Sequence, residues 1–324
     1  MSVVALNHFL NPLQSLLADA DINELIINKP NEVWIEKKGV FEKTLKPELD
    51  FNHLMQLVEL IAENTKQTIS ETKPLLAATL PDGYRVQCVI PPACPKDQVI
   101  IAIRRQTTMS LSLDDYVKTG AFNTINDSQT SSIHAGLAKL YEQKKYPEFL
   151  KQVIKNKITF IVSGGTSTGK TTFINACLGE IPCNERLIII EDARELFPSH
   201  ENIAHLMYSK GNQGVSTATP QELLECSLRL RPDRVILGEL RGSEAYTFLR
   251  AINTGHEGSI SSIHADSPEL AYEQIALMVM QNGLGLERAE IVKYIKGIIP
   301  IVVQLKRNAK GMRYISEITY DRIN

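Results

Sequence analysis

The chain has 324 residues, of which 43% are hydrophobic and 22% are charged. These fractions are typical of a folded protein of about two domains, and they exclude collagen-like, disordered and small disulfide-rich proteins. The 35 Lys and Arg residues nearly balance the 37 Asp and Glu residues, which leaves a net charge of −2. Because this balance gives no basic excess, we expect no sequence-specific nucleic-acid binding.

The cysteine pattern and the lack of apolar runs indicate the cellular compartment. The five cysteines are spread along the chain without a C-x-x-C pair, which favours reduced thiols over a disulfide framework or a zinc site. The first residues lack the charged segment that opens a secretory signal, and no apolar run approaches the roughly 18 to 20 residues that span a bilayer. We therefore expect a cytosolic protein whose contact with a membrane is at most peripheral.

The first third of the chain has the pattern of strands around one helix. Extended segments are expected at 24–28, 32–44, 85–90 and 98–105, where β-branched and apolar residues concentrate. Asp50 is the expected N-cap of the helix, whose apolar residues from Phe51 to Ile61 keep helical spacing. The sequence thus predicts a small α+β domain over 1–105, followed by a linker over 106–150 that begins rich in Ser, Thr, Asn and Asp.

Downstream of the linker, apolar strands alternate with helix-length segments. The strands are expected at 158–162, 187–190, 235–237 and 298–305. Continuous apolar strands of this kind are typical of a mostly parallel sheet covered on both faces. Thr219, Pro220 and Glu222 form a capping box at one helix start, and Ser243 precedes another. The sequence therefore predicts an α/β domain over 151–324.

The strongest motif satisfies G-x-x-x-x-G-K-[ST] between an expected strand and an expected helix. Backbone N–H groups of such a loop bind phosphates at the helix N-terminus. Lys170 is expected to reach the β- and γ-phosphate oxygens, and Thr171 to offer its hydroxyl to Mg²⁺. The strand–loop–helix context favours this interpretation over a glycine-rich turn that binds nothing. The predicted nucleotide-binding residues are Gly164, Gly165, Thr166, Ser167, Thr168, Gly169, Lys170, Thr171 and Thr172.

Two later apolar strands each run into carboxylates, Glu191-Asp192 and Glu239. Ligand chemistry in open parallel sheets collects at the carboxyl ends of strands. Such acids can hold Mg²⁺ or orient the water that attacks the γ-phosphate, whereas either acid alone could be a helix cap or a surface ion pair. Together with the P-loop they favour a functional role. Thr171, Asp192 and Glu239 are the predicted metal ligands, and the choice of catalytic base between Glu191 and Glu239 stays open.

His264 ends a short polar strand that follows Gly255-His256-Glu257-Gly258. A lone histidine is more often a structural residue, because histidine is intermediate in burial. We give that interpretation to His8, His53, His134, His200 and His205. A functional role for His264 is indicated only when its segment is considered together with the order of the other motifs along the chain.

These motifs together resemble the secretion ATPase superfamily of type II and type IV machines. In that superfamily the P-loop is the Walker A motif, and the Glu191-Asp192 pair falls in the Asp box. The block from Leu230 to Arg241 corresponds to the Walker B motif, and the block from Gly255 to Ala265 corresponds to the His box. Segments 22–28, 33–35 and 82–86 resemble its N-terminal part. With about 105 residues before the linker and no tetracysteine insertion, the chain is most similar to VirB11-type ATPases of type IV secretion and conjugation systems.

The resemblance implies a Mg²⁺-dependent ATPase with ATP and Mg²⁺ as cofactors, built from a RecA-like P-loop domain and a smaller N-terminal domain. It implies a homohexamer, peripheral on the cytoplasmic face of the inner membrane, which powers substrate translocation or pilus assembly beside VirB4- and VirD4-like ATPases. It places nucleotide between the two domains, where Arg85 and Arg104 approach the phosphates and His264 senses the γ-phosphate. The block from Leu113 to Tyr116 resembles the subgroup whose long linker lets domains exchange between neighbours.

One departure from the family and two alternatives accompany this interpretation. The family loop is commonly Gly-Gly-Thr-Gly-Ser-Gly-Lys-Thr, whereas this chain has Ser167-Thr168 in place of Gly-Ser. If position 167 needs a positive φ, Ser is strained there and Gly is not. The alternatives are a type IV pilus or type II secretion motor, and a nucleotide-gated assembly scaffold that hydrolyses little.

Overall fold

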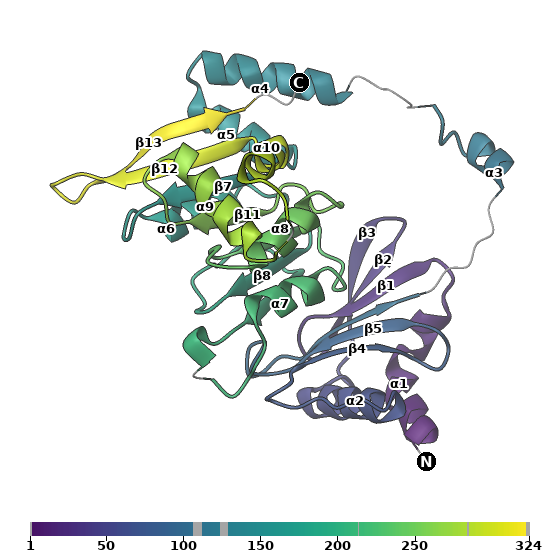
Figure 1. The fold of residues 1–324 in the computed structure, drawn as a ribbon. Helices are drawn as coiled ribbons and strands as arrows, with labels where there is room; N and C mark the ends of the chain where they lie inside the picture. Colours follow the sequence, from purple (N-terminus) through teal and green to yellow (C-terminus); the bar gives the residue numbers. More distant parts are fainter. Residues whose placement is uncertain (1, 106–111, 124–128, 213, 284, 322–324) are drawn as a thin grey trace.

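The computed structural model describes residues 2–105, 112–123, 129–212, 214–283 and 285–321. The described strands form a six-stranded sheet in the N-terminal part of the chain and a seven-stranded sheet in the C-terminal part. Figure 1 shows the two sheets in two adjacent lobes. This arrangement confirms the predicted fold class, a small α+β domain joined to a mostly parallel α/β domain.

The N-terminal sheet is antiparallel and carries two helices on one face. Its strand order is β3-β2-β1-β6-β5-β4. The strands are β1 (Ile22–Ile27), β2 (Glu32–Lys37), β3 (Val40–Leu45), β4 (Leu75–Thr79), β5 (Arg85–Val89) and β6 (Ile100–Arg104), and the helices are α1 (Ser2–Ala18) and α2 (Phe51–Asn64). Asp50 caps α2 as predicted, because its side chain accepts a hydrogen bond from the His53 N–H. Neither β4 nor α1 was predicted from the sequence, and α1 contains Pro12.

The C-terminal sheet is parallel except for its last strand. Its order is β13-β12-β7-β11-β10-β8-β9, and β13 runs antiparallel to β12. The strands are β7 (Phe160–Gly164), β8 (Leu187–Glu191), β9 (Ile203–Met207), β10 (Arg234–Leu237), β11 (Ile260–Ile263), β12 (Ile301–Arg307) and β13 (Arg313–Tyr320). The strand expected from residue 298 begins later, because α10 extends to Ile298 and Pro300 separates it from β12.

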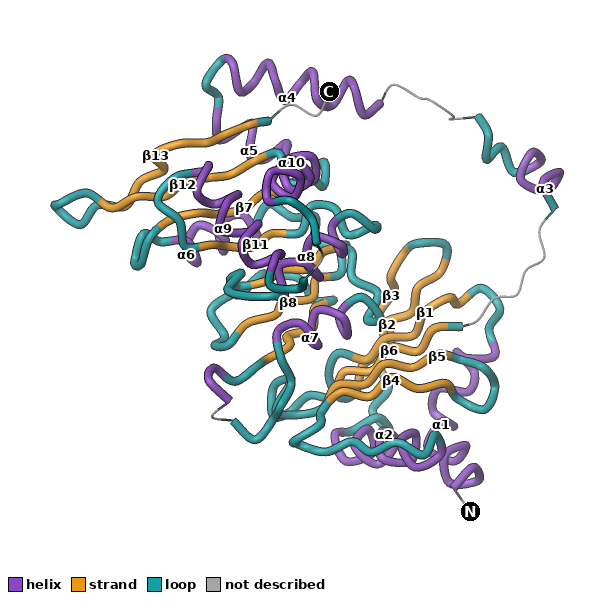
Figure 2. The backbone as a smooth tube through the Cα atoms, in the orientation of Figure 1, coloured by secondary structure: helices purple, strands orange, loops and turns teal. Residues whose placement is uncertain are grey.

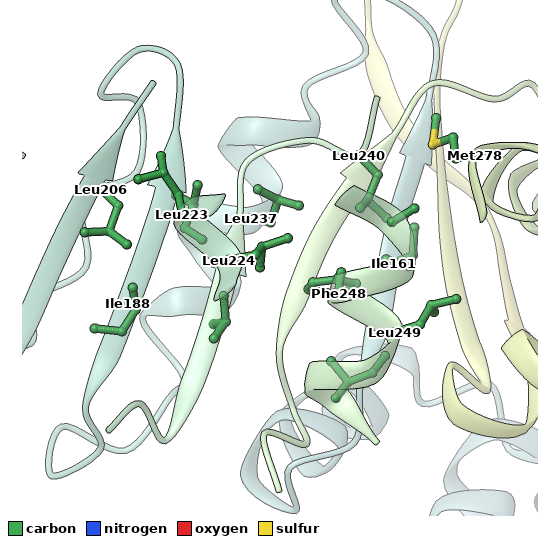
Figure 3. Packing of buried hydrophobic residues seen from close by; sticks show 14 of the residues in the cluster. Ile161, Ile188, Leu206, Leu223, Leu224, Leu237, Leu240, Phe248, Leu249 and Met278 are labelled. Atoms are coloured by element: carbon green, nitrogen blue, oxygen red, sulfur yellow. The ribbon is translucent and has the colours of Figure 1, made fainter. Parts of the chain in front are cut away.

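Helices cover both faces of the C-terminal sheet (Figure 2). They are α4 (Gln129–Glu142), α5 (Tyr146–Lys155), α6 (Lys170–Leu178), α7 (Pro220–Ser227), α8 (Glu244–Ile252), α9 (Pro268–Met280) and α10 (Arg288–Ile298). Ile188 and Ile190 lie in the core on one side, part of which Figure 3 shows, whereas Leu187 and Ile189 lie in the core on the other side. Successive residues of a strand face opposite sides of a sheet, so burial of both faces explains the continuous apolar runs. The capping box of Thr219 and Glu222 opens α7 as predicted.

The segment of the chain that connects the two domains contains the short helix α3 (Leu113–Lys118). Parts of the predicted 106–150 linker, at 106–111 and 124–128, lie outside the described residues. From residue 129 onwards, α4 and α5 share a hydrophobic cluster with the C-terminal sheet, to which they contribute Leu137 and Phe149. The boundaries at 105 and 150 stay predictions, and these contacts place the end of the linker segment on the second domain.

The two domains contact each other at the amino ends of strands β8 and β10. Arg186, just before β8, is fully buried and donates from Nη1 to Asn28 Oδ1 of the N-terminal domain over 2.7 Å. Arg231, before β10, donates from Nε to Glu36 Oε2 over 3.1 Å. Apolar residues of the N-terminal sheet such as Ile26 also join one hydrophobic cluster with the C-terminal domain. The N-terminal domain therefore packs on the edge of the second sheet where β8 and β10 begin.

Candidate active site

The P-loop connects the carboxyl end of β7 to the N-terminus of α6. Gly169, the N-cap of α6, has φ of 93°, and Ser167 has φ of 60°. Gly permits such left-handed conformations without cost, whereas a side chain is strained in them. Position 167 therefore does need a positive φ, and this chain carries a strained serine where the family pattern has glycine.

Lys170 lies folded over the loop from which it projects. Its Nζ donates to the Gly164 carbonyl oxygen over 2.8 Å and to the Gly165 carbonyl oxygen over 3.3 Å, and it lies 3.3 Å from His264 Nδ1. Burial lowers the pKa of Lys170, against the opposing effect of the Glu239 carboxylate. The amine is therefore held where phosphate oxygens bind in P-loops, by carbonyl groups that a phosphate can replace.

Glu191 is the last residue of β8, whereas Glu239 lies two residues after the end of β10, and the two acids have different surroundings. Glu191 is 3% exposed, and its Oε2 accepts hydrogen bonds from the backbone N–H groups of Glu195 (2.9 Å) and Leu196 (3.1 Å). Its Oε1 lies 3.3 Å from the Nδ1 atom of the buried His205. The Glu191 carboxylate thus holds the turn after β8 in place.

Glu239 lies between a histidine and an arginine. Its Oε1 is 2.7 Å from His264 Nε2, and its Oε2 accepts a hydrogen bond from Arg241 Nε over 2.6 Å. The contact with His264 lacks hydrogen-bond geometry, so Oε1 is buried without a hydrogen-bond partner among the described residues. A buried acceptor in this state is able to receive a proton or a hydrogen bond from a ligand or water.

The remaining predicted metal ligands have partners of their own. Asp192 forms ion pairs with Lys210 (2.9 Å) and Arg241 (3.0 Å). Burial raises the pKa of this carboxyl group, but the hydrogen bonds from the two cations outweigh burial and lower it overall. Thr171 Oγ1 donates to Glu195 Oε2 over 3.1 Å. Hard oxygen donors of the kind that Mg²⁺ prefers therefore surround the start of α6.

One cavity of about 450 Å³ collects most of the predicted site. Of the predicted residues, those that line it are Thr166, Ser167, Thr168, Gly169, Lys170, Thr171, Thr172, Glu191, Asp192, Glu239 and His264. The strand ends explain this convergence, because β7, β8, β10 and β11 are parallel neighbours and their carboxyl ends meet at one edge of the sheet.

Arg85 and Arg104 lie away from this cavity. They line a different one, of about 440 Å³, together with Glu24, Arg231 and His256. The residues that the C-terminal domain contributes there precede its strands, whereas the P-loop cavity lies where the strands end. Within one chain, the structure does not bring these arginines to the P-loop.

Several residues of the cavity were not predicted. Glu195, Lys210 and Arg313 line it, as does Arg241, which the sequence analysis noted only as part of a motif block. Glu195 follows the Glu191-Asp192 pair closely, so its proximity along the chain was a usable signal. Lys210 and Arg313 come from segments without a motif, and tertiary structure alone places them here.

The described helices include none with the length and the apolar character required to cross a bilayer. A phosphate-binding loop between strand β7 and helix α6, with acids at the ends of neighbouring parallel strands, defines the class of P-loop nucleotide-binding proteins.

Comparison with known proteins identifies the family. The family model for type II/IV secretion system proteins matches residues 8–319. The chain is 38% identical to the type IV secretion system protein VirB11 of Bartonella quintana over 96% of this chain and 92% of the relative. It is 39% identical to VirB11 of Brucella suis over 98% of this chain and 90% of the relative. The chain therefore belongs to the type II/IV secretion system protein family, within which it is a VirB11-type ATPase of type IV secretion.

A solved structure supports the same assignment. The crystal structure of the VirB11 ATPase of Brucella suis in complex with sulphate superposes with a TM-score of 0.92 at 37% identity. The match covers 99% of this chain and 98% of that chain, so it includes both domains. The resemblance noted from the ordered motifs is thereby confirmed.

Proposed function

We propose that the chain hydrolyses ATP with Mg²⁺ in the P-loop cavity and converts this reaction into domain motion that powers type IV secretion. The observation that carries the proposal is the meeting of Lys170, Glu239 and His264 in one cavity, where His264 lies within contact distance of both Lys170 and Glu239. A lysine that binds phosphate and a residue that orients the attacking water are recurring parts of phosphoryl-transfer sites. In this cavity Lys170 and Glu239 are placed for these two parts, and His264 contacts both.

The residues present fit a Mg²⁺ ion. In P-loop proteins Mg²⁺ is held by few protein oxygens and completes its shell with phosphate oxygens and water. Thr171 would bind it through its hydroxyl, with Asp192 and Glu239 acting directly or through water. Among the described residues no cluster of three or more His, Cys, Asp or Glu side chains forms an all-protein metal site. When bound, the ion would neutralise charge on the β- and γ-phosphates.

The contacts favour Glu239 over Glu191 as the general base. Among the residues that the structure describes, Glu239 has a carboxylate oxygen without a hydrogen bond, whereas both Glu191 oxygens are engaged with the chain. Glu239 would orient the attacking water and accept its proton. His264 contacts both Lys170 and Glu239. If a γ-phosphate moves Lys170, the contacts of His264 would change, and with them the contact of His264 with the base Glu239.

The site is completed by assembly in this proposal. Arg85 and Arg104 lie in another cavity of their own chain, and in this proposal the arginines that contact the phosphates come from a neighbouring copy. Family membership supports a homohexamer, peripheral on the cytoplasmic face of the inner membrane, working with other type IV secretion components such as VirB4- and VirD4-like ATPases. Guanidinium groups supplied in trans would stabilise charge on the γ-phosphate during transfer.

Phosphate release by the purified protein with ATP and Mg²⁺ tests the proposal. Lys170→Ala is expected to lose turnover while keeping the melting temperature of the wild type. Lys155→Ala, which removes an exposed lysine from α5, is the matched control and keeps full turnover. Wild-type turnover by Lys170→Ala would overturn the proposal. A wild type that binds ATP without measurable release would favour the nucleotide-gated scaffold.

A further inference from the structure

The C-terminal hairpin of β12 and β13 projects beyond the other strands of its sheet (Figure 1). In the sheet, Leu305 of β12 pairs with Gly164 at the end of β7. Two residues further along β12, Arg307 pairs with Arg313, the first residue of β13. The hairpin therefore extends past the carboxyl end of β7, and this register brings Arg313 beside the loop that follows β7.

Arg313 lies directly against the loop backbone. A Cβ atom added to Gly169 would be 3.0 Å from Arg313 Cδ and 3.8 Å from Arg313 Nε. The side chain thus passes close over the N-cap of α6 and lines the same cavity as Lys170 and His264. Its guanidinium is placed where the N-terminus of α6 already favours an anion.

Charge pairing in the cavity leaves Arg313 available. Lys210 and Arg241, two other cations that line the cavity, form ion pairs with Asp192, and Arg241 also binds Glu239. Lys170 is held by carbonyl oxygens. Within the part of the chain that the structure describes, the side chain of Arg313 forms no ion pair or hydrogen bond, although its backbone belongs to the β12–β13 ladder. Among the Lys and Arg residues described in this cavity, Lys170 and Arg313 are therefore the two that form no ion pair with a carboxylate.

We propose that Arg313 is a phosphate-binding residue of this site, supplied by the C-terminal hairpin of the same chain. The inference rests on the proposed function, since it assigns a further contact to the nucleotide. A guanidinium offers paired donors that match phosphate oxygens, and an unpaired one beside a helix N-terminus has no competing partner to leave. Arg313 would thus bind the polyphosphate within one chain, in contrast to Arg85 and Arg104.

Binding of ADP and of inorganic pyrophosphate, measured by titration calorimetry, tests this assignment. Arg313→Gln is expected to weaken both ligands about tenfold, and Arg313→Lys to recover part of the loss. Arg307→Gln is the matched control, because Arg307 is the cross-strand partner of Arg313 and does not line the cavity. It is expected to bind both ligands within about twofold of the wild type, and all variants should keep the wild-type melting temperature.

Three results would overturn the assignment. Unchanged binding by Arg313→Gln would show that the arginine does not touch the ligand. Weaker ADP with unchanged pyrophosphate would place Arg313 on the nucleoside. Equal losses in Arg313→Gln and Arg313→Lys with a lower melting temperature would show that it only shapes the loop. A Lys170→Ala variant that binds ADP as well as the wild type would instead contradict the proposed function itself, so the two failures are distinguishable.

Discussion

Glu191 ends strand β8 and Glu239 follows the neighbouring parallel strand β10, but of these two acids only Glu239 keeps a carboxylate oxygen without a hydrogen bond among the described residues. The sequence alone leaves these two acids equivalent as candidates for the catalytic base. Their contacts distinguish the two acids. Glu191 accepts hydrogen bonds from the turn after β8, whereas Glu239 contacts His264, which in turn contacts Lys170. From this difference we propose that Glu239 acts in the chemistry and that Glu191 contributes to stability.

Exchange of each acid for its amide tests this division. Glu239→Gln is expected to lower kcat about 100-fold or more with an unchanged melting temperature, because an amide cannot accept the proton of water. Glu191→Gln is expected to cost about 1–3 kcal/mol of stability, because a buried charged acceptor of two N–H groups is lost. Phosphate release and thermal unfolding measure the two effects. The reverse pattern would make Glu191 the base.

Alanine substitution of the two glycines at the start of the P-loop is expected to have different effects on the stability of the protein. An alanine Cβ at Gly164 would lie 2.6 Å from Thr168 Oγ1 and 2.7 Å from the Leu305 carbonyl oxygen, whereas one at Gly165 would meet nothing within 4 Å. Gly164→Ala is therefore expected to destabilise the protein by roughly 1–3 kcal/mol, because backbone has to move. Gly165→Ala should change stability by less than about 0.5 kcal/mol. Equal melting temperatures would show that β12 is not packed on the loop.

Glu24 predicts a pH dependence of stability. Burial raises its pKa from 4.5 to about 7, partly offset by Arg104, whose Nε lies 3.5 Å from Glu24 Oε1. Between these two values the folded chain holds a proton that the unfolded chain has released. Stability is therefore lost as pH rises through this window, by up to about 3 kcal/mol.

The comparison of Glu24→Gln with the wild type isolates this effect. The amide stays neutral, so the melting temperature of the wild type should fall relative to Glu24→Gln between about pH 5 and about pH 8. Glu48→Gln, which changes an exposed acid of the same domain, is the control and should follow the wild type. A constant difference between Glu24→Gln and the wild type across this range would show that Glu24 is ionised throughout.

Local patterns in the sequence were sufficient for much of the fold and the site. The strand-to-P-loop transition, the capping box at Thr219 and the acids after β8 and β10 are each encoded within a few residues. Since parallel strands bring their carboxyl ends to one edge, the sequence placed Lys170 and Glu239 together, and the family resemblance added His264.

Other features depend on contacts between distant segments. Helix α1 contains a proline, which weakens the helical signal, and it is stabilised by burial of residues such as Leu6 and Leu13. Arg313 enters the cavity because β13 pairs with β12, a non-local pairing without a short motif. The position of Arg85 and Arg104 follows from how the two domains dock, which involves contacts such as Asn28 with Arg186.

Phosphate release per subunit, measured across a dilution series of the purified protein with ATP and Mg²⁺, tests whether assembly completes the active site. The specific rate is expected to rise with protein concentration, in step with the appearance of a six-subunit species in sizing of the same samples. Arg85 and Arg104 would then complete the site from a neighbouring copy. A specific rate that stays constant while sizing shows dissociation to single chains would contradict completion of the site by assembly.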